Sequence, residues 1–404
     1  MLILVSYCHS LQLAVNILRK PNSVMDWGTM ASNAIVAGNN NALKDPLDHY
    51  NSVKEFFAIE VDAFIIAATL NHFGMEDTES KPTKNVMPEN LKKSSKEAQR
   101  TWLHKEVSSM LEKFVMPGVS RLPNLIAAYN PRPDLPCRGQ GCNRVFKYAK
   151  CRAKHEKKEH DLTVADEEVP TGENKVDVKE GKEDFVYNYG CLHLSIGLLL
   201  RNADDSVKEG DGERLLRVWN FLTVFYRANN HTKYALAALR LKASQLGLLT
   251  PREAHRLKWN RFASTKGGQG KCISRDLRLE QINKVSKESI RAMGAPNVNN
   301  NSIESSTKAT GPLLGLLQQS KEDLAQGTRA THHTNKVKQQ TFVTVLEQVH
   351  KKANVFNFKA GRKYTCFPEV ENDLYNGVNV KQLHRWIRQH QKKWHRQNHA
   401  YYKF

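Results

Sequence analysis

The sequence contains no long hydrophobic run. Its 404 residues are 40% hydrophobic, and no window approaches the roughly 18 to 20 uninterrupted apolar residues that a membrane-spanning helix requires. Residues 1–20 are apolar, but no basic segment precedes them, and His9 and Asn16 interrupt the run. We therefore expect no membrane association, and we expect a core helix at the start of the chain rather than a secretion signal.

Acidic residues are few relative to basic ones. The chain has 41 Asp and Glu against 61 Lys and Arg, which gives a net charge of +20 and a pI near 9.6. This balance predicts a polyanionic partner, with DNA or RNA first, although a basic surface that only maintains solubility is the alternative. The seven cysteines have scattered spacings, which argues against a disulfide framework and favours a reducing compartment, the nucleus or otherwise the cytoplasm.

Catalytic patterns are also scarce. No paired arrangement indicates a Ser or Cys nucleophile, residues 265–271 lack the spacing of a phosphate-binding loop, and no small-molecule substrate is evident. An acidic cluster is the exception, because clustered carboxylates can hold Mg²⁺ for phosphoryl transfer. We favour helix capping for it and keep a metal-dependent nuclease or transposase-type enzyme as the alternative. The cluster comprises Asp204, Asp205, Glu209, Asp211 and Glu213, and two later carboxylates could join it, Asp276 and Glu280.

Apolar residues at helical spacing dominate the rest of the chain. The expected fold class is mainly α, an irregular multi-helix domain with one small ββα zinc-finger insertion. Asp211 is expected to cap one helix, and Thr250 with Glu253 to form a capping box at the start of another. Residues 295–311, rich in Asn, Ser and Thr, are expected to form a loop. The expected segments are an N-terminal helical region (1–130), a zinc finger (134–162), an acidic linker (163–184), a helical core (185–292) and a C-terminal helical region with a basic tail (293–404).

Residues 136–160, PCRGQGCNRVFKYAKCRAKHEKKEH, contain Cys137, Cys142, His155 and His160 at regular intervals. Zinc prefers four tetrahedral ligands, which two thiolates of a hairpin and two imidazoles about one helical turn apart supply. We therefore predict that these four residues bind Zn²⁺. So short a segment cannot fold on hydrophobic burial alone, so metal binding and folding are expected to be one event.

The spacing resembles the two-cysteine two-histidine (C2H2-type) zinc finger. Phe146 is at the aromatic position of that family, where it would fill the small core between hairpin and helix. One position departs from the pattern. Arg152 replaces the leucine expected three residues before the first histidine, and we expect Cys151 or the aliphatic stem of Arg152 to substitute in part.

The helix of such a finger carries the residues that can contact nucleic acid. One finger covers about three base pairs, so a structural role, in which the finger binds a protein or holds a fold together, is an equal alternative. The base-facing positions have Tyr148, Lys150, Cys151 and Lys154, and the residues available for phosphates are Arg152, Lys157 and Lys158.

The last part of the chain is strongly basic. Residues 381–404 contain seven Lys or Arg, four His and no acidic residue, with aromatic residues interleaved. Such a mixture can contact phosphates by charge and bases by stacking. The alternative is a solvated helix that covers the core with Leu383, Trp386 and Ile387.

Several stretches, VYNY, EGDGER, TKYALAAL, LKWNRF and DLRLEQIN within residues 183–283, resemble a large eukaryotic family known only as a domain of unknown function. EFFAIEVDAFIIAA near residue 60 resembles its upstream helix, and animal members often carry a finger between the two. Members look like relics or components of mobile elements. Longer members have a further N-terminal region with acidic positions, and this chain is expected to begin after it, so the resemblance implies a transposase remnant rather than an active enzyme.

Together these patterns predict a zinc-binding, non-catalytic protein of transposon-derived origin that associates with nucleic acid or chromatin. The alternatives are the metal-dependent enzyme described above and a protein-interaction module in which the finger is only structural.

Overall fold

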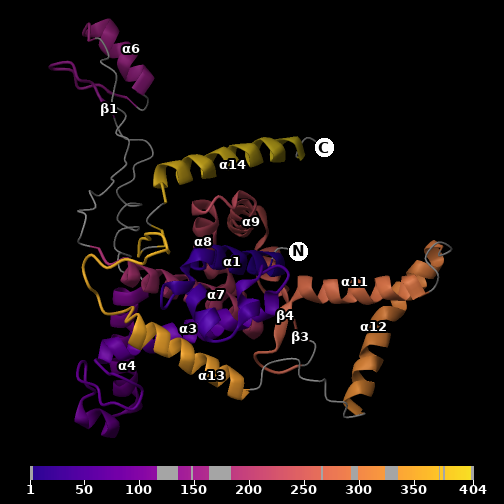
Figure 1. The fold of residues 1–404 in the computed structure, drawn as a ribbon. Coiled ribbons are helices and arrows are strands. Elements are labelled where there is room, and N and C mark those ends of the chain that lie inside the picture. The colour runs from indigo at the N-terminus through magenta and orange to yellow at the C-terminus, as the bar shows by residue number, and fades with distance from the viewer. Residues whose placement is uncertain are drawn as a thin grey trace. The chain divides into compact units, whose positions relative to one another are not determined.

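The structure, a computed structural model, consists mainly of helices (Figure 1). Within the described residues the strands form two two-stranded sheets, so the predicted mainly α fold class is confirmed. None of the helices in these ranges combines the length and the apolar character that a membrane span needs. The structure describes residues 3–115, 135–146, 149–162, 183–264, 267–292, 299–323, 335–372, 374–375 and 378–401.

The chain divides into two compact units, which are described separately. The first contains helices from both sides of the predicted finger, so segments that are distant in sequence belong to one unit. The second contains the finger and the last helix. The first unit comprises residues 1–117, 185–358 and 363–374, and the second comprises residues 118–184, 359–362 and 375–404.

In its described residues the first unit is helical apart from one β-hairpin. Its two longest core helices are α3 (Tyr50–Phe73) and α7 (Phe185–Glu209), which pack against each other. The remaining α-helices and strands are α1 (Ile3–Leu18), α2 (Met30–Val36), α4 (Lys96–Met110), α8 (Gly212–Ala228), α9 (Thr232–Ala243), α10 (Pro251–Trp259), β3 (Phe262–Ser264), β4 (Cys272–Ser274), α11 (Arg275–Ala292), α12 (Asn300–Asp323) and α13 (Asn335–Leu346).

Short 3-10 and π-helical turns join these elements. A π-helical turn follows α4, α9 and α13 in each case without a break, so each of these helices ends in a wider turn. The turns are η1 (Pro21–Met25), η2 (Asn40–Leu43), η3 (Glu89–Lys93), η4 (Leu111–Val115), η5 (Ser244–Leu248) and η7 (Glu347–Lys352).

Close packing of α3 against α7 forms the centre of the core. Phe56 and Phe64 of α3 are fully buried, as is Ile196 of α7. At Gly197 an added Cβ would lie 2.5 Å from a methyl carbon of Val61, so only glycine lets the two helices approach this closely at that point.

Tyr189 connects α7 to the N-terminal helices. Its buried hydroxyl donates to the carbonyl of Leu18 at 3.1 Å and accepts from the backbone N–H of Met30 at 2.9 Å. Burial raises the pKa of Tyr189 well above its usual value, and the nearby Glu60 adds to the increase. The phenol therefore stays neutral, and it satisfies backbone groups at one helix end and one helix start.

Asp26 binds the C-terminal part of the first unit. Its carboxylate accepts the backbone N–H groups of Thr365, Cys366 and Phe367 at 2.7 to 2.9 Å. A buried carboxylate is stable when several donors satisfy it. This contact fixes residues 363–367 against the N-terminal helices of the same unit.

Two predicted helix starts are confirmed. Asp211 caps α8, where its carboxylate accepts the N–H of Arg214 at 2.9 Å. Thr250 and Glu253 form the predicted capping box at the start of α10. Both caps satisfy N–H groups that the first helical turn leaves without partners.

The loop predicted for residues 295–311 is wrong over its described part, because α12 begins at Asn300. The side chain of Asn299 accepts the backbone N–H of Ser302 at 2.8 Å, which is the contact of an N-cap. The Asn-rich composition thus reflects a helix start. Residues 295–298 lie outside the described ranges.

The second unit contains the predicted finger and the C-terminal helix. Buried Asp184 accepts hydrogen bonds from both Nε and Nη2 of Arg362, and from the backbone N–H of Lys359 at 2.7 Å. A two-point contact with arginine is one of the few arrangements that stabilises a buried carboxylate. The elements of this unit are β1 (Leu135–Pro136), β2 (Val145–Phe146), α6 (Ala149–Glu159) and α14 (Val380–Tyr401).

Candidate metal centre

A short β-hairpin positions the two cysteines. Strands β1 and β2 are antiparallel, with Leu135 opposite Phe146. The N–H of Cys137 donates to the carbonyl of Arg144 at 2.8 Å, and the N–H of Cys142 donates to the carbonyl of Gly139 at 3.1 Å. These bonds close a tight turn, so the two thiols lie on the same side of it.

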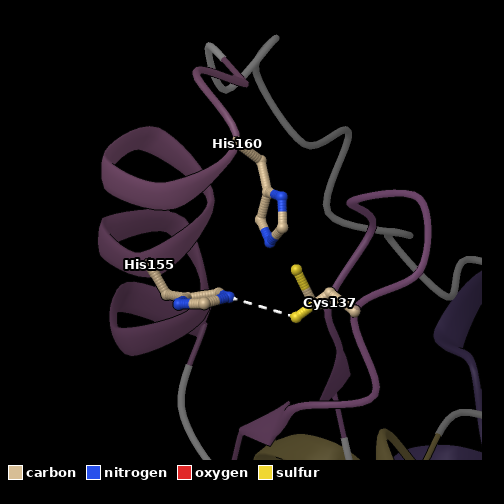
Figure 2. A group of neighbouring side chains, drawn as sticks. Cys137, His155 and His160 are labelled. Carbon is tan, nitrogen blue, oxygen red and sulfur yellow. Dashed lines mark hydrogen bonds between the residues drawn. The ribbon is translucent and has the colours of Figure 1, made fainter.

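Helix α6 positions the two histidines. His155 lies inside the helix, and His160 follows its last residue, with its N–H bonded to the carbonyl of Glu156 at 3.1 Å. Both imidazole rings face the sulfur atoms of the hairpin (Figure 2). The ligand atoms of Cys137, Cys142, His155 and His160 all lie within 4.8 Å of one another, so this group can hold a metal ion.

The spacing of the ligand atoms fits a tetrahedral ion. Cys142 Sγ lies 3.4 Å from His155 Nε2. With about 2.3 Å to sulfur and about 2.0 Å to nitrogen, a tetrahedral zinc holds these two ligand types about 3.5 Å apart. His160 Nε2 is buried and has no hydrogen-bond partner within the described residues, which is what a metal-binding nitrogen requires.

The hairpin turn is shaped around the ligands. An added Cβ at Gly139 would lie 2.5 Å from the ring of His160, so glycine is required there. The N–H of Gly139 donates to the sulfur of Cys137 at 3.4 Å. Burial nevertheless raises the pKa of the Cys137 thiol, and Cys142 adds to the increase. A bound cation would reverse this balance, because metals bind the thiolate form.

The small core of the predicted finger contains an ionic cluster at the place where two-cysteine two-histidine fingers have a leucine. Glu156 is fully buried, and Arg138 makes a two-point contact with it at 3.2 and 2.8 Å. Arg152, at the departing position, places its Nε 3.6 Å from the same carboxylate. Hydrogen bonds from Arg138 lower the pKa of Glu156 to about 2 against the opposing effect of burial.

Glu156 and Arg138 are the residues that the sequence interpretation missed. Arg152 and Glu156 are four residues apart, a spacing that places both on one face of a helix and favours an ion pair. That spacing was a readable signal. Phe146 is at its expected place, with its ring centroid 4.9 Å from that of His155.

The residues predicted to contact nucleic acid differ in their exposure. The side chains of Lys154, Lys157 and Lys158 are exposed on α6. The side chain of Arg152 is 11% exposed and contacts Glu156. Lys150 lies in α6, although its side chain is outside the described part, and Tyr148 lies outside the described residues.

The acidic cluster is neutralised by cations of the first unit. Asp204 pairs with Lys54 at 2.7 Å and with Lys208 at 2.8 Å. Arg214 lies 2.9 Å from Glu209 and 3.9 Å from Asp205.

Glu213, the last acid of that cluster, pairs with Lys258 at 2.7 Å. Among the described residues, Asp276 and Glu280 do not join the cluster in a group that could hold a metal, and the Cys and His site is the one such group found. The carboxylates of the cluster therefore act as caps and ion-pair partners.

The six cysteines whose side chains are described form no disulfide.

The fold and the site define a mainly α-helical protein with a two-cysteine two-histidine group that can hold a metal ion. Residues 7–336 match a family described as a family of unknown function (DUF6589), and the chain belongs to this family. No curated protein and no solved structure matches the chain.

Proposed function

We propose that Cys137, Cys142, His155 and His160 bind a structural Zn²⁺, and that the chain is a zinc-binding protein that associates with nucleic acid or chromatin without catalysis of its own. The observation that carries this proposal is the approach of all four ligand atoms to within 4.8 Å of one another. Two thiolates and two imidazoles are a donor set that zinc prefers.

A zinc ion with four protein ligands would contribute folding free energy rather than chemistry, because no position is left for water or substrate. The chain's own residues support a structural role. The buried ionic cluster of Arg138, Arg152 and Glu156 joins the hairpin to the helix beside the ligands. The acidic residues of the cluster are paired with lysines and arginines. They therefore do not support the alternative, a metal-dependent enzyme.

The nucleic acid part of the proposal rests on charge. The net charge is +20, and the exposed side chains of Lys154, Lys157 and Lys158 lie on the finger helix. Lysines arranged in this way can neutralise phosphates, and such contacts weaken as salt increases. A nuclear location and an origin in a mobile element belong to the same proposal.

The test is a nucleic acid pull-down with the full chain, combined with zinc quantification. Wild type should retain zinc and bind nucleic acid, and Cys142→Ser should lose zinc and bind nucleic acid more weakly. Cys151→Ser is the matched control for zinc retention, because Cys151 is exposed and is not a ligand. Binding that does not weaken between low and moderate salt would contradict the nucleic acid part, and zinc-free wild type would contradict the metal part.

A further inference from the structure

Helix α14 (Val380–Tyr401) has cationic residues on one face. Lys381, Arg385, Arg388 and Lys392 follow one another at intervals of three or four residues, which places them on one side of a helix. All four side chains are exposed. With His384 and Gln389 they line a surface hollow of about 360 Å³.

The cations of this face differ from several cations of the first unit that are paired with carboxylates. Lys54, Arg214 and Lys258 each pair with a carboxylate at 2.7 to 2.9 Å. Within the part of the chain that the structure describes, none of the four cations of the α14 face forms an ion pair with a carboxylate. The sequence from residue 374 to the end contains no Asp or Glu, so this helix also lacks an acidic neighbour along the chain.

The opposite face of α14 is apolar and partly covered. Leu383, Trp386 and Ile387 are half-buried, and the ring of His390 lies 5.0 Å from that of Trp386. The helix therefore presents its cationic side to solvent.

We propose that the cationic face of α14 is a second nucleic acid contact, which binds the phosphate backbone of double-stranded DNA. This inference rests on the proposed nucleic acid association but uses a different part of the chain from the finger. The four cations extend over about 16 Å of helix, at roughly 1.5 Å per residue. The same length of duplex carries about ten phosphate charges, and the major groove, about 12 Å wide, admits a helix.

The half-buried apolar face and the arginines favour this occupant over an anionic membrane. A helix that lies on a membrane inserts its apolar face, and here that face is half-buried and is interrupted by His390. Arginine forms two-point contacts with phosphate, which suits Arg385 and Arg388. A membrane surface is therefore treated as an outcome of the test.

The experiment measures binding of the full chain to a short mixed-sequence DNA duplex over a range of salt concentrations. The test variant replaces Lys381, Arg385, Arg388 and Lys392 with Gln. The matched control makes the same change at four exposed cations of the first unit, so both variants lose equal charge: Lys92, Lys93, Lys96 and Arg100.

The test variant should lose at least about tenfold in affinity, and its slope of log K against log salt should be shallower by about 3 to 4 than that of wild type. The control should change little. A further variant with Arg385→Lys and Arg388→Lys keeps the charge and should keep the slope, and circular dichroism and zinc content verify that each variant is folded.

Equal affinities and slopes for the test variant and the control would overturn the inference. A parallel assay measures binding to phosphatidylserine vesicles. If the test variant loses vesicle binding but keeps duplex binding, the helix binds a membrane surface and the inference is overturned. Cys142→Ser separates the two proposals. If Cys142→Ser weakens duplex binding and the α14 variant leaves it unchanged, the finger binds alone. The reverse result leaves α14 as the contact and removes the finger.

Discussion

Arg138 of the hairpin and Glu156 of the finger helix form a two-point ion pair inside the predicted finger. Arg138 Nε and Nη2 lie 3.2 and 2.8 Å from the carboxylate oxygens, and the backbone N–H of Arg138 donates to the same group at 2.9 Å. Arg138 is adjacent to Cys137 and Glu156 is adjacent to His155. One part-buried contact therefore connects the cysteine side of the site to the histidine side.

Glu156→Gln should weaken zinc binding by about 10- to 100-fold, the range typical of groups that orient metal ligands. The neutral amide would remove the charge that holds Arg138 and Arg152 together. Competition with a chromogenic chelator measures the affinity. Glu159→Gln is the control, because Glu159 is exposed and pairs with exposed Lys158 at 3.5 Å. Equal affinities for the two variants would show that the ionic cluster does not support the site.

Removing the metal should unfold the finger and leave the first unit intact. The finger has only two strands of two residues and one short helix, so it lacks a core that could fold alone. Limited proteolysis after chelation should cut within residues 135–162, and the thermal transition of the first unit should stay in place. A shift of that transition by more than a few degrees would contradict the independence of the two units.

Gly197→Ala should destabilise the first unit by about 1 to 3 kcal/mol, because its Cβ would overlap Val61 in the packed α3–α7 contact. Urea unfolding followed by circular dichroism measures the change. Gly247→Ala is the matched control, since an added Cβ there meets nothing within 4 Å. It should be neutral or stabilising by about 0.4 to 1 kcal/mol. Similar losses for both variants would show that α3 and α7 do not pack as described.

Asp204 should contribute to stability at neutral pH and lose its contribution in acid. Burial opposes its ionisation, but hydrogen bonds from Lys208 and Lys54 outweigh burial and lower its pKa below the usual value. A carboxylate with a lowered folded-state pKa stabilises the protein above its unfolded pKa, near 4, and the contribution disappears as pH falls through the folded value.

The difference in urea midpoint between wild type and Asp204→Asn should therefore shrink as pH falls from about 6 to about 3. Asp205→Asn is the control, because its carboxylate is more exposed and lies 3.9 Å from Arg214. A difference for Asp204→Asn that grows in acid would contradict the assignment.

Local signals in the sequence predicted a large part of this structure. The caps at Asp211 and Thr250 follow from residue type and spacing, and the approach of the four metal ligands follows from their intervals. These features depend on residues close together in the chain, where spacing alone determines geometry.

Contacts between distant segments were not predictable from the sequence. Asp26 accepts three backbone N–H groups from residues more than 300 positions away in the sequence. No local pattern around Asp26 predicts this contact. The hairpin of β3 and β4 was also missed, because its strands have only three residues each. The contact of Arg152 with Glu156 was not predicted either, although the two residues are only four apart in the sequence.

The most direct test of the central claim is the zinc content of the purified full-length chain. The account predicts one zinc ion per chain in wild type and in Cys151→Ser, and loss of zinc in Cys142→Ser and His160→Ala. Wild-type protein that contains far less than one zinc per chain, and that takes up none when zinc is supplied, would contradict the account.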